Sequence, residues 1–213
     1  MAKGDLLLGC DAQLYQIQKF IPNVSQKTLI AMLSKLRDLV GKSIEKNNDT
    51  LIFGDEVELK NVEMDEACFG KKSKNNRGKV WKKKWVFGIK GHNRKIFMTT
   101  VPDRKKATLQ PYILKHISKT AIIHHDDWAS YRNLHKVGYN HKIVKHTKNF
   151  KDPITGACTN GIEGIWGNMK QRITRMHGCH IDKLDCYLHE FSFRYMNKDN
   201  MLPATINALS EYK

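Results

Sequence analysis

The segment NVEMDEACF (residues 61–69) is the first of a series of short apolar stretches that decides the fold class. Two further strand-like stretches follow it, KKWVFGIKG (83–91) and KIFMTTV (95–101). Helical patterns then alternate with two more strand patterns, AIIHHD (121–126) and NHKIVKHT (140–147). An antiparallel start followed by alternating strands and helices predicts an α/β fold, with a mixed five-stranded sheet flanked by helices.

Helical patterns lie between and after the last strands. We expect helices over ATLQPYILKHIS (107–118) and WASYRNLHKVG (128–138), the second of them ended by Gly138 as a C-cap. From Thr159 to about Tyr195 the pattern indicates two helices, broken around Gly178. The last strand is therefore followed only by helices.

The first 50 residues predict a small helical module. Apolar residues in SQKTLIAMLSKLRDLVGKSI (25–44) recur at spacings of three and four, and Ser25 is a plausible N-cap. A short helix, a turn and a longer basic helix suit a DNA-binding helix-turn-helix, and they suit a plain helical hairpin equally well. The predicted organisation is this helical module (1–50), a linker (51–60), a sheet domain (61–200) and a C-terminal tail (201–213).

The charge balance points to a polyanionic partner. Lys and Arg number 37 against 21 acids, which gives a formal net charge of +16. Such an excess is typical of proteins that bind nucleic acid. The segment KKSKNNRGKVWKKK (71–84) contributes eight of these cations and no acid, so it is predicted to contact the DNA backbone, with a solvated loop as the alternative. The predicted contacts in this segment are Lys71, Lys72, Lys74, Arg77, Lys79, Lys82, Lys83 and Lys84.

Nothing in the sequence predicts a membrane or secretory protein. The apolar run Leu6–Leu8 is too short for a signal peptide, and no stretch approaches the roughly 20 apolar residues of a membrane span. The five cysteines include no CxxC pair, which disfavours a zinc ribbon. We expect an intracellular protein with no membrane partner.

Three acids have the placement of a metal site. Side chains alternate along a strand, so Asp65 points away from the face of Met64. Asp126 ends a buried strand, where sites of open α/β sheets gather, and alternation favours it over its rival Asp127. Glu163 lies in the first turn of the helix predicted over residues 159–176, at the flank of its apolar stripe.

Carboxylates in these positions suit phosphodiester chemistry. Two divalent ions about 3.5–4 Å apart can activate a nucleophile and stabilise the charge that develops on the phosphate. Magnesium and manganese prefer carboxylate oxygens. The expected cofactor is therefore Mg²⁺ or Mn²⁺, as two ions, and Lys170, two helical turns after Glu163, could contact a phosphate.

Several segments together resemble the transposases of the Merlin superfamily and their bacterial insertion-sequence relatives. They occur in the order of that family, they cover roughly residues 60–197, and the spacing within GACTNGIEGIWGNMK is the most specific of them. The matching segments are VEMDEACFG (62–70), WVFGI (85–89), VPDRKKATLQPYI (101–113), HDDWASY (125–131), GYNHKIVKHTKNFKDPITGACTNGIEGIWGNMK (138–170) and LHEFSFRYM (188–196).

The resemblance implies a DDE transposase with an RNase H-like catalytic domain, whose acids map on Asp65, Asp126 and Glu163 and whose following basic residue maps on Lys170. It also implies DNA partners, namely transposon ends and target DNA, a homo-oligomer assembled on DNA, and nuclear localisation if the chain is eukaryotic. Relatives commonly carry His where Cys158 lies, and they often begin with a zinc ribbon, so the chain could be a truncated or decayed copy. The alternatives are a transposase-derived, non-catalytic DNA-binding protein and a nuclease that cuts without joining.

Overall fold

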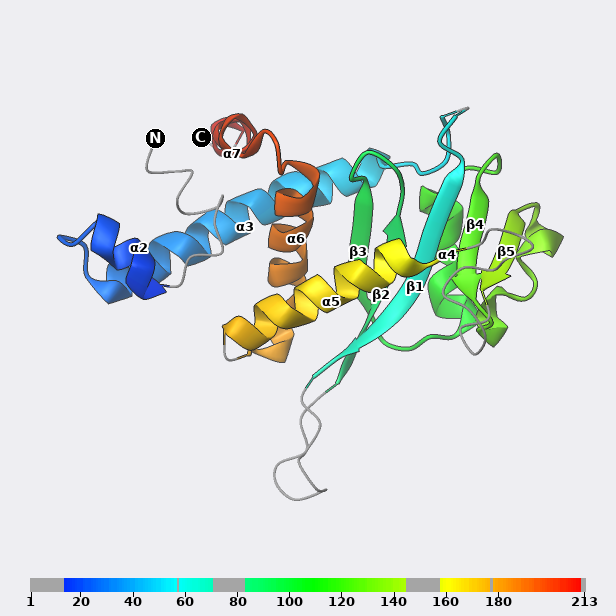
Figure 1. The fold of residues 1–213 in the computed structure, drawn as a ribbon, viewed down its shortest axis with the longest axis horizontal. Coiled ribbons are helices and arrows are strands. Elements are labelled where there is room, and N and C mark those ends of the chain that lie inside the picture. The colour runs from blue at the N-terminus through cyan, green and yellow to red at the C-terminus, as the bar shows by residue number, and fades with distance from the viewer. Residues whose placement is uncertain (1–13, 57, 71–82, 145–157, 177, 212–213) are drawn as a thin grey trace, which may run out of the picture. The chain divides into compact units, whose positions relative to one another are not determined.

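The computed structural model describes residues 14–56, 58–70, 83–144, 158–176 and 178–211 (Figure 1). The chain forms two compact units, one of residues 51–184 and one in which residues 185–213 join residues 1–50. This division differs from the predicted one, in which the sheet domain continued to residue 200. The segment predicted as a tail from residue 201 begins with a helix.

The larger unit is built on a mixed five-stranded sheet, as predicted. The strand order is β3-β2-β1-β4-β5. Strand β2 is antiparallel to both β1 and β3, whereas β4 is parallel to both β1 and β5. The strands are β1 (Asn61–Phe69), β2 (Lys84–Lys90), β3 (Ile96–Val101), β4 (Ile122–Asp126) and β5 (Asn140–Val144).

A tight turn connects β2 to β3. Asn93 and Arg94 both have positive φ, of 50° and 59°, and the backbone N–H of Lys95 donates to the carbonyl of His92 (2.8 Å). Positive φ at both central residues is the type I′ geometry, whose twist matches that of paired strands. The turn therefore fixes the register of this hairpin.

Two helices cover opposite faces of the sheet: α4 (Lys106–His116) and α5 (Asn160–Arg175) (Figure 1). Leu109 of α4 belongs to the same buried cluster as Met64 of β1. On the other face, Trp166 of α5 lies against Gly88 of β2. Strands β1 and β2, in the middle of the sheet, thus lie between two helices.

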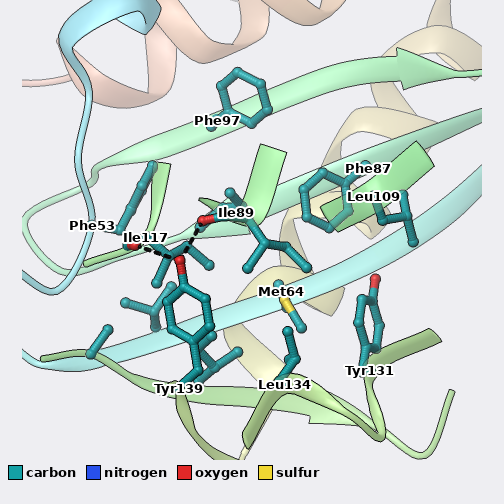
Figure 2. Packing of buried hydrophobic residues seen from close by; sticks show 14 of the residues in the cluster. Phe53, Met64, Phe87, Ile89, Phe97, Leu109, Ile117, Tyr131, Leu134 and Tyr139 are labelled. Carbon is teal, nitrogen blue, oxygen red and sulfur yellow. Dashed lines mark hydrogen bonds between the residues drawn. The ribbon is translucent and has the colours of Figure 1, made fainter. Parts of the chain in front are cut away.

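The main core lies between the sheet and α4 (Figure 2). Tyr139 closes it at the end of the helix: its hydroxyl lies 3.2 Å from the carbonyl oxygen of Ile113 and 3.0 Å from that of Ile117. The last carbonyls of a helix have no partner within the helix, so a buried hydroxyl donor stabilises this end. Other residues that Figure 2 labels in the cluster are Phe53, Met64, Phe87, Ile89, Phe97, Leu109, Tyr131 and Leu134.

The predicted helix over residues 128–138 is wrong. Two short 3₁₀ turns occupy this stretch, η2 (Ala129–Tyr131) and η3 (Leu134–Val137). Trp128 has an extended backbone, because its backbone N–H donates to the side chain of Asp126, two residues earlier, and its indole donates to the carbonyl of Arg104. Gly138 does end η3 in the left-handed conformation, with φ of 82°, so the predicted cap is confirmed.

The smaller unit is helical. Ser25 caps α3 as predicted, because its hydroxyl accepts from the backbone N–H of Thr28 (3.1 Å). Val40 of α3, Phe193 of α6 and Ala208 of α7 share a small buried cluster. The helices are α2 (Leu14–Phe20), α3 (Gln26–Thr50), α6 (Leu184–Met196), after the short turn η4 (Ile181–Lys183), and α7 (Met201–Ser210).

Within the described ranges, no helix combines the length and the apolar character that a membrane crossing requires.

Candidate active site

The three acids singled out in the sequence lie on β1, β4 and α5. Asp65 is in the middle of β1, Asp126 is the last residue of the neighbouring parallel strand, and Glu163 is in the first turn of α5. The pKa of Asp65 is raised to about 6, mainly by burial and in part by the negative charges of Asp126 and Glu163. The structure therefore brings the other two acids within electrostatic reach of Asp65.

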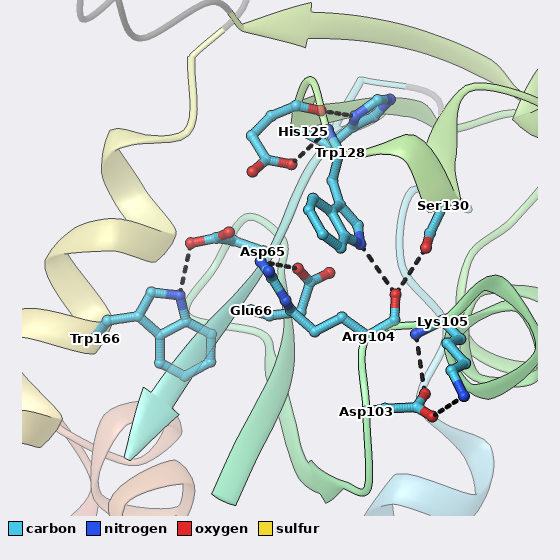
Figure 3. Close-up of polar contacts among 10 residues, drawn as sticks. Asp65, Glu66, Asp103, Arg104, Lys105, His125, Trp128, Ser130 and Trp166 are labelled. Carbon is cyan, nitrogen blue, oxygen red and sulfur yellow. Dashed lines mark hydrogen bonds and ion pairs between the residues drawn. The ribbon is translucent and has the colours of Figure 1, made fainter. Parts of the chain in front are cut away.

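A tryptophan orients the first acid. The buried indole of Trp166 donates from Nε1 to Oδ2 of Asp65 (3.0 Å; Figure 3). Its ring lies against Gly88, which pairs directly with Asp65 in the sheet. A Cβ at Gly88 would lie only 2.5 Å from the indole, so glycine is what lets the ring approach the strand. The sequence assigned Trp166 only to an apolar stripe and did not predict this contact.

The third acid is held at the start of α5. Thr159 donates from Oγ1 to Oε1 of Glu163 (2.8 Å). The first turn of the helix is itself tied to β1, because Oε2 of Glu63 accepts from the backbone N–H of Ile162 (2.8 Å). Lys90 pairs with the other oxygen of Glu63 (3.1 Å). The strand that carries the first acid thus also anchors the helix that carries the third.

Asp126 and its rival, Asp127, make different contacts in the structure. Oδ1 of Asp126 accepts from the backbone N–H of Trp128 (3.1 Å). Asp127 is half exposed and lies 3.5 Å from the guanidinium of Arg132. Asp126 has the contacts expected of a fixed site residue, and Asp127 those of a surface ion pair.

A fourth carboxylate, not predicted, lies beside the other acids. The side chain of Glu66 is fully buried, and in the described part of the chain neither of its oxygens has a hydrogen-bond partner. Burial raises its pKa to about 8, with further repulsion from Asp65 and Asp126, while Arg104 acts in the opposite direction. The sequence contained a signal for it, since the alternation that puts Met64 in the core puts Glu66 on the same side.

Arg104 lies between two aromatic rings, one of which, that of Trp128, is drawn in Figure 3. Its guanidinium carbon is 4.1 Å from the ring centre of Trp85 and 3.8 Å from that of Trp128. The sequence did not decide whether Arg104 pairs with Asp103 or lines the site. In the structure Asp103 accepts from the Thr108 hydroxyl (2.6 Å) at the start of α4, and Arg104 faces Glu66.

Two histidines support the end of β4. Nδ1 of His125 is hydrogen-bonded to the backbone carbonyl of Asp126, and its Nε2 lies 2.8 Å from Nδ1 of His141. A carbonyl can only accept, so Nδ1 of His125 carries the proton and His141 donates to Nε2. Burial lowers the pKa of His125 to about 4, which agrees with this neutral form.

Cys158 lies just before α5. Its backbone N–H donates to Nδ1 of His124 (3.1 Å), and its sulfur accepts from the backbone N–H of Asn160 (3.4 Å). The cysteine therefore contributes to the start of the helix that carries Glu163.

Only part of the predicted DNA-contact set can be placed. Lys83 is exposed, Lys84 is the first residue of β2, and Lys170 is exposed on α5 with Nζ 5.7 Å from the ring centre of Phe69. The remaining predicted contacts lie outside the described residues: Lys71, Lys72, Lys74, Arg77, Lys79 and Lys82.

The donor chemistry of the site fits the expected cofactor. Asp65, Asp126 and Glu163 offer only carboxylate oxygens, the ligands that Mg²⁺ and Mn²⁺ prefer. The repulsion that raises the pKa of Asp65 is also what a divalent cation would relieve. Among the described side chains, no three His, Cys, Asp or Glu residues are gathered closely enough to hold one ion as they stand.

The fold and the site define a mixed α/β domain with a cluster of carboxylates where β1 meets the parallel strand β4. The chain belongs to the ISXO2-like transposase domain family, whose model matches residues 59–196. An "uncharacterized transposase-like protein" of Haemophilus influenzae is 26% identical over 105 residues, which are 49% of this chain and 84% of that relative. A crystal structure of a pre-cleavage Mos1 transpososome aligns with 98% of this chain and 77% of that chain, at 12% identity and a TM-score of 0.37. A score this low does not establish a shared fold.

Proposed function

We propose that this chain is a DDE transposase of the Merlin type, with an RNase H-like catalytic domain, that cleaves DNA at transposon ends and joins them to target DNA. Membership in a transposase domain family supports the reaction class. The observation that carries the proposal is the placement of the three acids: Asp65 lies on β1, Asp126 ends the neighbouring parallel strand β4, and Glu163 lies in the first turn of α5, which is hydrogen-bonded to β1.

In this proposal Asp65, Asp126 and Glu163 hold Mg²⁺ or Mn²⁺, as two ions. The chemistry supplied by bound ions is charge stabilisation at the phosphate and activation of the attacking water or 3′ hydroxyl. The role of the chain is to fix the ligands: Trp166 orients Asp65, and the backbone of Trp128 orients Asp126. Partners of this kind orient metal ligands.

The basic residues supply the DNA-binding surface in the proposal. Lys83, Lys84 and Lys170 lie on or next to β2 and α5, the elements that flank Asp65 and carry Glu163. Lysines contact phosphates as point charges and largely without regard to sequence. We therefore expect binding to both transposon-end and target DNA, by a homo-oligomer assembled on the DNA.

Amide substitutions test the catalytic role. We expect Asp65→Asn, Asp126→Asn and Glu163→Gln each to reduce Mn²⁺- or Mg²⁺-dependent strand cleavage by at least about 100-fold, as when one group that stabilises developing charge is lost. Duplex DNA binding should persist, because the amides keep the shape of the site. The measurement is cleavage of end-containing DNA, with strand transfer of a pre-cut end as a second assay.

Asp127→Asn is the matched control, since it changes the adjacent, exposed acid. It should cleave at the wild-type rate. Wild-type cleavage by any of the three amide variants would remove that residue from the site. DNA binding without cleavage by the unaltered chain would identify a non-catalytic protein, and cleavage without strand transfer would identify a nuclease.

A further inference from the structure

We infer that Arg104 is a positioning residue for Asp126 and acts through Trp128. This inference rests on the proposed function, because it concerns one of the acids assigned to the metal site. Arg104 lies between β3 and α4, whereas Asp126 ends β4, so the two are joined only by tertiary contacts.

Asp126 is the last residue of β4. Among the described residues, the ladder between β4 and β5 runs up to the pair Asp126–Val144. The backbone N–H of Trp128 donates to Oδ1 of Asp126 (3.1 Å). The position of Trp128 is therefore one determinant of where that carboxylate lies.

Arg104 holds Trp128 in two ways (Figure 3). The Trp128 indole donates from Nε1 to the backbone carbonyl of Arg104 (3.0 Å), and its ring stacks on the guanidinium (3.8 Å). The hydroxyl of Ser130 donates to the same carbonyl (2.7 Å). The chain after β4 is thus attached to Arg104 at two side chains.

The guanidinium is fixed from its other side as well. Trp85 of β2 covers its second face at 4.1 Å, and Nη1 lies 3.9 Å from the fully buried carboxylate of Glu66. A planar, permanently charged group can stack on two rings and still face a carboxylate, which a lysine ammonium cannot do. The arrangement is therefore specific to arginine.

The test compares Arg104→Ala and Arg104→Lys with Arg132→Ala, a control that removes an exposed arginine near the same turn. Mn²⁺ affinity and the Mn²⁺ spectrum are followed by electron paramagnetic resonance, and hydrogen exchange of the Trp128 indole by NMR. We expect Arg104→Ala to weaken Mn²⁺ binding about 10- to 100-fold, the range for groups that orient metal ligands, and to speed indole exchange. Arg104→Lys should not restore affinity, and Arg132→Ala should match wild type.

Trp128→Phe keeps a ring over the guanidinium but removes the indole hydrogen bond to the backbone carbonyl of Arg104. It therefore tests the second contact between Trp128 and Arg104 should Arg104→Ala fail to fold. We expect it to weaken Mn²⁺ binding several-fold at nearly unchanged thermal stability. The inference would be overturned if Arg104→Ala, Arg104→Lys and Trp128→Phe, where they fold, bound Mn²⁺ as tightly as wild type while Asp126→Asn lost Mn²⁺ binding. If Asp65→Asn and Asp126→Asn also bound Mn²⁺ as wild type does, the proposed function would fail and the inference with it.

Discussion

At the scale of single residues, protein donors hold each acid of the candidate site: the indole of Trp166 for Asp65, the backbone of Trp128 for Asp126, and the hydroxyl of Thr159 for Glu163. The negative charges of Asp65 and Asp126 nevertheless oppose ionisation of the nearby Glu66, and burial of Glu66 opposes it further. A site that gathers buried like charges lowers the stability of the metal-free protein.

The loss of stability caused by Glu66 should depend on pH. Its pKa rises from 4.5 to about 8 on folding, so between these values the folded state binds more protons than the unfolded state. The free energy of unfolding should therefore be highest below about pH 4.5 and fall as the pH rises towards 8. We predict that Glu66→Gln stabilises the metal-free protein near pH 8 and flattens this decline, as measured by urea unfolding across the range.

The control for this prediction is Glu58→Gln, a change at an exposed glutamate outside the site. It should leave the pH profile as it is. Part of the decline should persist in Glu66→Gln, since the pKa of Asp65 is also raised, to about 6. An unchanged profile in Glu66→Gln would contradict the buried, charge-repelled environment of this side chain.

At the scale of elements, α5 depends on close contact with β2. The indole of Trp166 fills the space where a side chain of residue 88 would lie. We predict that Gly88→Ala destabilises the protein by about 1–3 kcal/mol, the usual cost of overpacking, because the new Cβ would lie 2.5 Å from the ring. Chemical denaturation measures the loss, and Mn²⁺ affinity should fall with it as Trp166 moves away from Asp65.

The same substitution at Gly167 should change the free energy of unfolding in the opposite direction. This exposed glycine lies within α5, and nothing lies within 4 Å of the Cβ it would gain. Alanine is favoured over glycine in a helix by about 1 kcal/mol, so Gly167→Ala should stabilise. Equal effects of the two substitutions would show that helix propensity, not the indole contact, decides the result at Gly88.

Local patterns predicted most elements, and tertiary contacts explain the exceptions. Short apolar stretches separated by turn residues identified all five strands, because such a pattern lies in consecutive residues. Residues 128–138 were predicted as a helix, yet Trp128 is extended because it binds Asp126 and Arg104.

The candidate acids were identified from strand ends and a motif, but their supporting contacts were not. The Trp166–Asp65 hydrogen bond joins residues 101 apart, and the Glu63–Ile162 bond joins residues 99 apart. No spacing along the chain indicates such pairs, since they depend on the strand order and on which face α5 covers. The importance of Gly88 likewise becomes visible only with the sheet register.

At the scale of the whole molecule, a net charge of +16 should dominate DNA affinity. We predict that duplex binding weakens about 1000-fold or more between about 50 and 200 mM salt, as for proteins that neutralise about six or more phosphates. Replacing both Lys83 and Lys84 with Gln should reduce the slope of log affinity against log salt by about 2. Fluorescence anisotropy with a short duplex measures both.

An exposed lysine outside the predicted contacts, Lys198, supplies the control. Lys198→Gln should leave the slope unchanged. Salt-independent binding would mean that charge does not drive the association.

Residues 185–213 form one compact unit with residues 1–50. Arg37 of α3 pairs with Glu190 of α6 at 2.7 Å, and Glu190 pairs with Arg194 at 2.8 Å. The Arg37–Glu190 contact joins residues 153 apart, so the boundary predicted from the sequence at residue 200 did not anticipate it.

The contacts behind the acids bear on how copies of a mobile element in a genome are judged. A reading frame is commonly called intact when its acidic triad survives. In this fold, a copy could keep Asp65, Asp126 and Glu163 and still lose the indole of Trp166 or the guanidinium of Arg104. Under the proposed function, such a copy would keep its three acids but lose the contacts that orient them, so an inventory of active elements should score these two positions beside the triad.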